Sequence, residues 1–306
     1  MKTQYDFHTL DVFTQKRFGG NPLAVFPDAI GLDSALMQTI AGEMNLSETV
    51  FVQPPADTRA HCKVRIFTPA RELPFAGHPT VGTGYLLATL GRIPLREERT
   101  TVLFEEGVGL VPVEVRTRDG KADFVQLTAA KLPEFGPSPP DRMQLAAMLH
   151  IQPDDILDGV DRPQAASCGV PFLFVPVRDR GVLARAAPDT ARWRAALGDY
   201  WAREVFVFCR DPELPGSNLR ARMFAPEAGI TEDPATGGAC AALGGYLGVR
   251  ATIADGTLHW VVEQGFEMKR PSLLHIETDL KGGRIAAVRV GGHSVLVSQG
   301  TLRLDS

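Results

Sequence analysis

The chain has 306 residues, of which 44% are hydrophobic and 22% are charged, and its formal net charge is −4. This balance is typical of a globular protein large enough for two domains, and it offers no basic surface to nucleic acid or an anionic membrane. No apolar run is long enough to span a membrane, and the N-terminal stretch MKTQYDFHTL lacks the apolar core of a signal peptide. Isolated cysteines without a CxxC pair favour a reducing compartment. We therefore expect a cytoplasmic protein with no nucleic-acid or membrane partner.

The first half of the chain predicts a β-rich lobe built around one apolar helix. Alternating apolar residues predict strands at 5–13, 23–26, 49–52, 62–67, 102–103 and 109–115. Helical spacing predicts one helix from Leu32 to Met44 and another from about Pro79 to Leu90, after a glycine-rich turn. The proline-rich segment 132–140 is the expected linker.

The second half predicts the same order of elements. Helices are expected at 141–149 and, in a stretch of small apolar residues, from about Ala239 to Leu247. Strands are expected at 172–177, 205–208, 219–224, 258–262, 273–278 and 285–290, with the last one starting at 294–298. Since the central helix of each half has no polar face, it must be buried on all sides. That requirement predicts a sheet wrapped around a helix in each lobe.

One sequence pattern occurs twice and indicates a duplicated domain. Residues 65–69 (RIFTP) match residues 222–226 (RMFAP) at an offset of 157, and the motif ExPxxG recurs from Glu72 to Glu232 at an offset of 160. Offsets that rise along the chain are what a duplication with small insertions would leave. Two lobes with paired glycine-rich turns suggest a single ligand cleft between them.

Each repeat ends in a glycine-rich turn that opens a helix, at Gly77-His78 in the first half and at Gly237-Gly238 in the second. Glycine lets successive backbone N–H groups approach a ligand, and the positive end of a helix favours an anion. The turns are therefore candidate cradles for a carboxylate, although a tight turn that only permits close packing is the alternative. Neither turn has the P-loop or GxGxxG pattern, so we expect no nucleotide cofactor.

Three titratable residues lie beside these turns or between apolar elements. His78 stands at the start of the first helix and Asp233 just before the second, where histidine is often structural and aspartate often a cap. Glu48 lies between a helix end and an apolar strand, so it is either a buried general base or an exposed loop residue. The residues alone leave both interpretations open.

Metal binding and nucleophilic catalysis find little support in the sequence. His61, Cys62 and His78 are too dispersed for a recognisable ligand set, and no HExxH motif is present. There is no GxSxG elbow, and Cys240 falls inside a predicted helix, where core packing is its expected role. We expect no metal site.

Several of these stretches together resemble the PhzF (phenazine biosynthesis-like) family. They are GNPLAVF, AGEMNLSETVFV, RIFTPARELPFAGHPTVGTGYLL, EDPATGGACAALGGYL, QGFEMKRPS and GGHSVLVSQG, in this order over nearly the whole chain. The resemblance implies an α/β (α+β) diaminopimelate epimerase-like fold of two pseudo-symmetric lobes, each a mostly antiparallel, barrel-like sheet around a central helix. It implies lobes at 1–130 and 131–296, an active site between them, and a last strand at about 297–306 that returns to the first lobe.

The same resemblance implies a homodimeric, cofactor-independent isomerase that shifts a proton on a small carboxylate-bearing substrate, such as a cyclic dihydro-hydroxyanthranilate. Glu48, in the NLSET segment, would be the acid/base, and His78 and Asp233 would assist it. The expected substrate-binding residues are Ser47, Gly77, Gly237 and Gly238. Gly238 stands where many family members have serine, so a hydroxyl contact is missing there.

Two other functions remain open from the sequence. Racemases of this fold use one cysteine from each lobe, just before the two glycines, where this chain has Ala76 and Thr236. A two-cysteine racemase is therefore disfavoured, but an epimerase that uses Glu48 as its one base is not. A protein that only binds small carboxylates is the non-enzymatic alternative.

Overall fold

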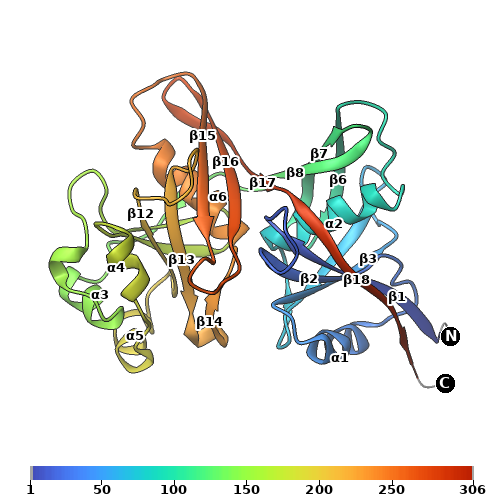
Figure 1. Ribbon diagram of the computed structural model, residues 1–306, viewed down its shortest axis with the longest axis horizontal. Helices are drawn as coiled ribbons and strands as arrows, with labels where there is room; N and C mark the ends of the chain where they lie inside the picture. Colours follow the sequence, from blue (N-terminus) through green and yellow to red (C-terminus); the bar gives the residue numbers. More distant parts are fainter. Residues whose placement is uncertain (1–2, 305–306) are drawn as a thin grey trace. The chain divides into compact units, whose positions relative to one another are not determined.

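The computed structural model describes residues 3–304 and divides the chain into two compact units. The first unit comprises the chain up to Ala130 together with the segment from Gly291 onward, and the second is Lys131–Val290. Figure 1 shows that each unit consists of strands around a central helix, α2 in the first and α6 in the second.

The first unit contains two helices within a mostly antiparallel array of strands. Its elements are β1 (Gln4–Val12), β2 (Asn21–Phe26), α1 (Ser34–Met44), β3 (Glu48–Gln53), β4 (Cys62–Phe67), β5 (Glu72–Leu73), α2 (Gly77–Thr89), β6 (Arg99–Glu106), β7 (Gly109–Arg118), β8 (Lys121–Thr128) and β18 (Ser294–Arg303). Strand β1 pairs with both β2 and β18, so the last strand of the chain lies beside the first. The pairs β2–β3 and β4–β6 are parallel.

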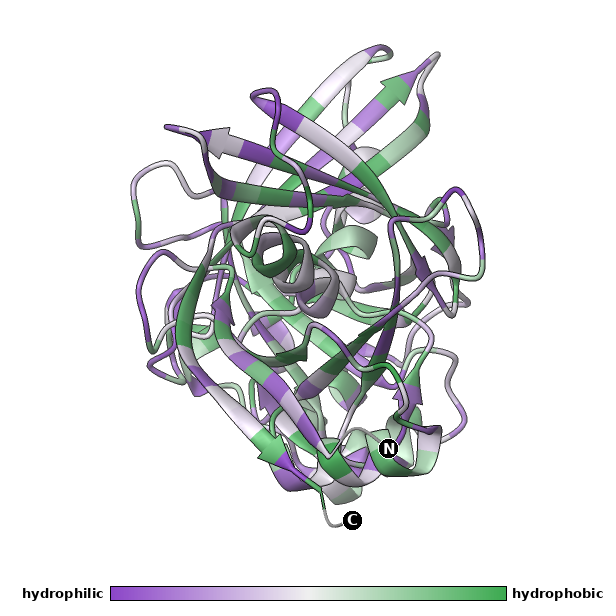
Figure 2. Ribbon diagram, turned by 90° about the vertical axis from the view of Figure 1, so that its right-hand side faces the viewer, coloured by the Kyte–Doolittle hydropathy of each residue, from purple (hydrophilic) through white to green (hydrophobic). Residues whose placement is uncertain are grey.

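Helix α2 is enclosed because its residues are small or apolar on every side. It contacts β1, β2, β3, β7, β8 and β18, and Figure 2 shows the first unit with strands of alternating hydropathy around a central helix. A Cβ atom on Gly82 would lie 2.6 Å from the side chain of Leu23 and 2.7 Å from that of Val12. The glycines inside the helix therefore serve close helix–sheet packing.

The second unit has the same plan with additional short helices. Its elements are β9 (Glu134–Phe135), α3 (Arg142–Met148), η1 (Pro153–Asp155), β10 (Gln164–Ser167), β11 (Pro171–Pro176), α4 (Arg180–Arg185), α5 (Thr190–Leu197), β12 (Glu204–Cys209), β13 (Leu219–Ala225), η2 (Pro226–Ala228), β14 (Ile230–Asp233), α6 (Gly237–Gly248), β15 (Gly256–Gln264), β16 (Ser272–Lys281) and β17 (Arg284–Gly292). Helix α6 is buried from its first turn to its last, and the Cys240 thiol lies inside it, fully buried.

The internal repeat is visible in the strand pairing of the two units. In the first, β2 runs parallel to β3 with Leu23 opposite Glu48, and in the second, β11 runs parallel to β12 with Phe172 opposite Glu204. The next strands repeat as well, because β4–β6 and β13–β15 are both parallel pairs. These pairings give the predicted α/β fold class, with a mostly antiparallel sheet around a helix in each unit.

Two predictions about helices need correction. Helices α2 and α6 begin at Gly77 and Gly237, two residues before the predicted starts, so both glycine-rich turns form the first helical turn itself. Helices α4 and α5 were not predicted, although each begins after an aspartate whose side chain accepts a backbone N–H bond, Asp179 and Asp189. Within residues 3–304, no helix is both long and apolar enough to cross a membrane.

Candidate active site

Glu48 is the first residue of β3 and is only 8% exposed. Helix α1 ends at Met44, and Asn45 follows in the left-handed conformation, φ 49°, which turns the chain sharply into the strand. The parallel pairing of β3 with β2 then sets Glu48 opposite Leu23, inside the first unit. Of the two interpretations that the sequence left open, the structure therefore selects the buried carboxyl group. Ser47 lies just before it in the turn and is half-buried.

His78 is the second residue of α2, and it lies against Glu48. Its Nε2 atom is 3.2 Å from Oε2 of Glu48, and its side chain is buried. Burial lowers the pKa of His78 to about 3, because the imidazolium ion would lose its hydration. The histidine is therefore neutral near pH 7 and carries one ring proton.

Asn21 decides which ring nitrogen carries that proton. The side-chain amide nitrogen of Asn21, the first residue of β2, lies 3.2 Å from Nδ1 of His78. An amide NH₂ group can only donate, so Nδ1 accepts and the ring proton sits on Nε2, the nitrogen that lies 3.2 Å from Oε2 of Glu48. Sequence reasoning missed Asn21, although the GNP stretch in which it stands belongs to the family resemblance.

Asp233 closes β14 in the second unit and is bonded to the turn that follows. The Thr236 hydroxyl donates to Oδ2 of Asp233 over 2.6 Å, and Nε2 of Gln264 donates to that hydroxyl oxygen over 2.9 Å. Gln264 also donates to the main-chain oxygen of Asp233 and accepts from the Thr236 N–H. One glutamine therefore holds both ends of the DPAT turn, and it directs a hydroxyl proton toward the aspartate.

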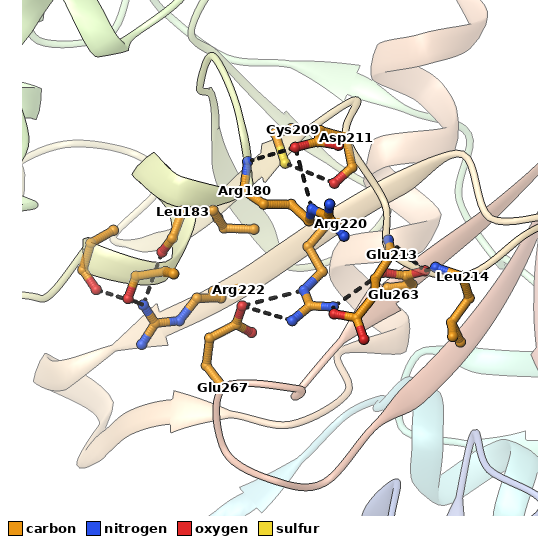
Figure 3. A network of polar contacts seen from close by, with 12 residues as sticks. Arg180, Leu183, Cys209, Asp211, Glu213, Leu214, Arg220, Arg222, Glu263 and Glu267 are labelled. Carbon is orange, nitrogen blue, oxygen red and sulfur yellow. Dashed lines mark hydrogen bonds and ion pairs between the residues drawn. The ribbon is translucent and has the colours of Figure 1, made fainter.

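Behind this turn lies a buried ionic network, shown in Figure 3. Arg220 on β13 bonds to Glu263 on β15 over 3.2 Å and to Glu267 over 2.9 Å, and its guanidinium group stacks on Phe266 at 3.9 Å. These contacts join β13 to Glu263 in β15 and to Glu267 in the loop that follows β15. The network supports Gln264, the last residue of β15, which stands in the QGFEMKRPS stretch but was not predicted as a site residue.

The starts of α2 and α6 differ from those of the other helices. Aspartate side chains cap four helices, at Asp33, Asp141, Asp179 and Asp189. The N-cap residues of α2 and α6 are Ala76 and Thr236, and neither side chain caps its helix. The first-turn amides of these two helices are left without a side-chain acceptor from the N-cap, which suits them to an anionic ligand.

The predicted site residues thus fall into two groups. In the first unit the structure brings Glu48 and His78 into contact, with Gly77 opening the same helix. In the second unit Asp233 stands four residues before Gly237, which with Gly238 opens the helix. Among residues 3–304, no cluster of three or more His, Cys, Asp or Glu side chains is arranged to hold a metal ion.

Comparison with known proteins places the chain. Residues 10–300 match the PhzC-PhzF family, described as phenazine biosynthesis-like protein. The chain belongs to this family. An uncharacterized isomerase of Mesorhizobium japonicum is 40% identical over 297 residues, covering 95% of this chain and 96% of that protein. The trans-2,3-dihydro-3-hydroxyanthranilate isomerase of Pseudomonas aeruginosa is 33% identical over 293 residues, with 95% and 96% covered.

Solved structures agree with this assignment. A phenazine biosynthesis protein of the PhzF family from Bacillus anthracis superposes with a TM-score of 0.88 at 26% identity, covering 99% of this chain and 100% of that one. A hydroxyproline epimerase from Agrobacterium vitis has a TM-score of 0.64 at 16% identity, covering 100% and 94%, a likeness that shows the fold alone. The chain is a PhzF-family isomerase with a diaminopimelate epimerase-like fold, as the sequence predicts.

Proposed function

We propose that this isomerase shifts a proton between two carbon atoms of a small carboxylate-bearing metabolite, with Glu48 as the single acid/base. The observation that carries the proposal is the buried contact between Glu48 and His78, 3.2 Å apart, at the uncapped start of α2. A carboxyl group paired with a neutral imidazole can take up a proton and give it back without a change in the charge of the histidine.

The reaction is balanced by one proton and one electron pair. Glu48 takes a proton from a carbon atom next to a conjugated double bond, and the electron pair of that C–H bond spreads into the π system and the substrate carboxylate. The protonated Glu48 then returns the proton to another carbon on the same face, and the double bond moves. No oxidant and no second substrate are needed.

His78 would assist through its Nε2–H group. Because burial keeps the ring neutral, Nε2 carries its proton 3.2 Å from Oε2 of Glu48, and a small movement of the side chains would align the two groups for donation to the carboxylate before proton removal. Once Glu48 holds the substrate proton, the same N–H becomes available to the charge that develops on the substrate. The main-chain N–H groups of the first turn of α2, starting at Gly77, would bind the substrate carboxylate.

We propose that Asp233 takes part in the same reaction, supported by its retention in the EDPATG motif and by its hydrogen bond from Thr236. The Thr236 proton bonds to one carboxylate oxygen and fixes the orientation of the group. The amides of Gly237 and Gly238 and the hydroxyl of Ser47 complete the proposed set of binding groups. Ser47 and Gly238 are half-buried and Gly237 is buried, and their position beside Glu48 and Asp233 in the chain supports this assignment.

The proposed substrate class is a cyclic diene carboxylate similar to a dihydro-hydroxyanthranilate. The name of the Pseudomonas aeruginosa relative and its 33% identity support this class. We further propose that the isomerase is a cytoplasmic homodimer, on the strength of the family resemblance and the composition. Sedimentation equilibrium on the purified chain tests the dimer, which a monomer mass would contradict.

Deuterium incorporation tests the proposed function. Wild type and Glu48→Gln are incubated in heavy water with trans-2,3-dihydro-3-hydroxyanthranilate and with a panel of small cyclic and acyclic carboxylates, and products are analysed by NMR and mass spectrometry. A rearranged double bond, with or without deuterium on carbon, that depends on Glu48 supports the proposal. Exchange at a stereocentre without rearrangement identifies an epimerase instead. Turnover by Glu48→Gln at the wild-type rate overturns the mechanism.

A further inference from the structure

Glu106, the last residue of β6, is a buried carboxyl group that the proposed reaction does not use. Its side chain is 5% exposed, and its Oε1 atom lies 2.7 Å from the hydroxyl oxygen of Thr80 on α2. Its other oxygen, Oε2, is buried and has no hydrogen-bond partner among residues 3–304. An ionised carboxylate with one bare, buried oxygen would carry a charge that nothing solvates.

The Thr80 hydroxyl shows where a proton is needed. Its oxygen lies 2.7 Å from Glu106 and also 2.8 Å from the main-chain oxygen of Ala76, the residue before α2. A threonine hydroxyl has a single proton and can donate it to one of these oxygens only. Both contacts are hydrogen bonds if the Thr80 proton goes to Ala76 and a proton on Glu106 goes to Thr80.

We propose that Glu106 is a positioning residue that stays protonated in the folded protein and, through Thr80, fixes the first turn of α2, where His78 lies. The carboxylic O–H donates to the Thr80 oxygen, and the Thr80 O–H donates to Ala76. The relay ends at the helix start, so it sets the direction of the first-turn N–H groups. The inference rests on the proposed function only in assigning that turn to substrate binding.

The internal repeat supports a neutral side chain at position 106, because the matching position of the second unit holds glutamine. In the first unit β4 and β6 pair with Lys63 opposite Glu105, and in the second β13 and β15 pair with Arg220 opposite Glu263. Each glutamate forms an ion pair with the basic residue opposite it, over 3.5 Å in the first unit and 3.2 Å in the second. Each also accepts two main-chain N–H groups from the loop that leads into the basic residue's strand, β4 or β13. Their roles in the two units are therefore the same.

The residue that follows this glutamate holds the central helix in each unit. In the second unit it is Gln264, whose amide bonds to Thr236 at the start of α6. In the first unit it is Glu106, which bonds to Thr80 in the first turns of α2. A protonated glutamic acid has the same donor-and-acceptor character as the glutamine amide, whereas a carboxylate can only accept.

The end of β6 is also held against the segment that leads into α2. The Val108 N–H donates to the main-chain oxygen of Pro74 over 2.9 Å, and a Cβ atom on Gly107 would lie 2.8 Å from Cα of Pro74. These contacts fix the backbone that carries Glu106 against the segment that precedes α2.

The electrostatic surroundings agree with the geometry. Burial raises the pKa of Glu106 to about 8, against an opposing contribution from the Thr80 hydrogen bond. Cys62 on β4 faces it as a neutral thiol, because burial, with a smaller effect of Glu106, raises the pKa of Cys62 to about 12. His78 on α2 is neutral as well, and the neighbouring Glu105 is engaged with Lys63 and the amides of Ala56 and Asp57.

Thermal unfolding of wild type and Glu106→Gln between pH 5 and pH 9 tests the protonation. The ordinary pKa of 4.5 applies to the unfolded chain, so the unfolded state releases this proton while the folded state keeps it up to about pH 8. Glu106 therefore makes the stability of wild type fall, relative to that of Glu106→Gln, as pH rises through this window. We expect the Tm of Glu106→Gln, relative to that of wild type, to rise by on the order of 10 °C from pH 5 to pH 9. A difference that is independent of pH overturns the proposal.

A direct measurement removes any ambiguity from other titrating groups. The infrared band of a protonated carboxyl group should be present in wild type at pH 7 and absent from Glu106→Gln. The glutamine variant is the matched control, because it keeps the size of the side chain and its hydrogen bond to Thr80. A spectrum in which the two proteins do not differ in this band contradicts a protonated Glu106.

Positioning is tested by the NMR signals of the His78 ring in the intact protein. Thr80→Val breaks the relay and should shift these signals, whereas Thr80→Ser and Glu106→Gln should leave them close to wild type. Unchanged His78 signals in Thr80→Val would show that the relay does not set the turn. None of these measurements uses turnover, so a failure of the proposed reaction leaves them interpretable.

Discussion

Oε2 of Glu48 lies 3.2 Å from Nε2 of His78, and the two residues are 8% and 4% exposed. Such a contact in the protein interior makes each group dependent on the charge of the other. Since Asn21 donates to the opposite ring nitrogen, the ring proton lies on Nε2, the nitrogen beside the carboxyl group. The carboxyl group therefore has a neutral neighbour, and substitutions at the two positions should have different signatures.

Glu48→Gln should remove turnover while leaving the fold intact. The amide has nearly the shape of the carboxyl group but cannot take up a proton, so we expect a loss on the order of 10³-fold or more in kcat. Single-turnover assays and circular dichroism on the same preparation measure the two effects. The control is Glu204→Gln, at the matching position of the second unit, opposite Phe172. Equal losses in the two variants would argue against a special role for Glu48.

His78→Gln should change how stability depends on pH. Burial lowers the pKa of His78 to about 3 from the ordinary 6.5, so below pH 6.5 the unfolded state binds a proton that the folded state refuses. The contribution of His78 to wild-type stability therefore falls as pH drops through this window, by about 1.4 kcal/mol for each pH unit. The glutamine variant lacks this loss. Urea unfolding at pH 7 and pH 5 measures the change in the free energy of unfolding with pH. If this change is the same in the two proteins, His78 is protonated in the folded state.

The sequence predicts the elements that depend on local patterns. The period of the apolar residues predicts α1 and many of the strands, although it misses β8 (Lys121–Thr128) and β10 (Gln164–Ser167), and the repeat of ExPxxG indicates a duplicated domain. The predicted starts of α2 and α6 are two residues late, because glycine has a low helix propensity and its presence indicates a turn. Helix α4 was not predicted from the sequence because it is short and only partly apolar, although Asp179 is a typical N-cap residue.

Contacts between distant residues lie beyond what a single sequence can predict. Asn21 and His78 are 57 positions apart, and Gln264 reaches back 28 positions to Thr236. Each polar partner is ordinary in its own stretch of sequence. Only the pairing of strands around the central helix brings it to the helix start, so family resemblance could name Glu48 and His78 but not the groups that hold them.

Thr236→Val should misorient Asp233 without unfolding the second unit. The substitution keeps the shape but removes the hydroxyl that donates to Asp233 over 2.6 Å, and it leaves a Gln264 N–H without its acceptor. We expect a stability loss of about 1–3 kcal/mol and a fall in kcat, since the proposed role of Asp233 depends on its orientation. Thr236→Ser keeps the hydroxyl and should retain activity. Full activity of the valine variant would show that the Thr236 hydroxyl is not needed for turnover.

Gly82→Ala should destabilise the first unit, even though alanine is the better helix former. The new Cβ atom would lie 2.6 Å from Leu23 and 2.7 Å from Val12, which forces the helix away from the sheet. Overpacking of this kind costs about 1–3 kcal/mol. Thermal unfolding measures the loss. If the variant is as stable as wild type, the core around α2 can expand more easily than its burial indicates.

Gly238→Ser should be tolerated by the fold and should change substrate binding. A Cβ atom on Gly238 would lie 3.7 Å from the ring of Phe172, an ordinary van der Waals contact, and the helix itself favours serine over glycine. The same kind of substitution that α2 rejects at Gly82 is therefore open at the first turn of α6. The added hydroxyl stands beside the amides proposed to hold a carboxylate, so we expect KM to change more than kcat. Gly238→Ala, which adds the carbon but not the hydroxyl, is the matched control. If serine and alanine have the same effect on KM, the hydroxyl makes no contact with the substrate.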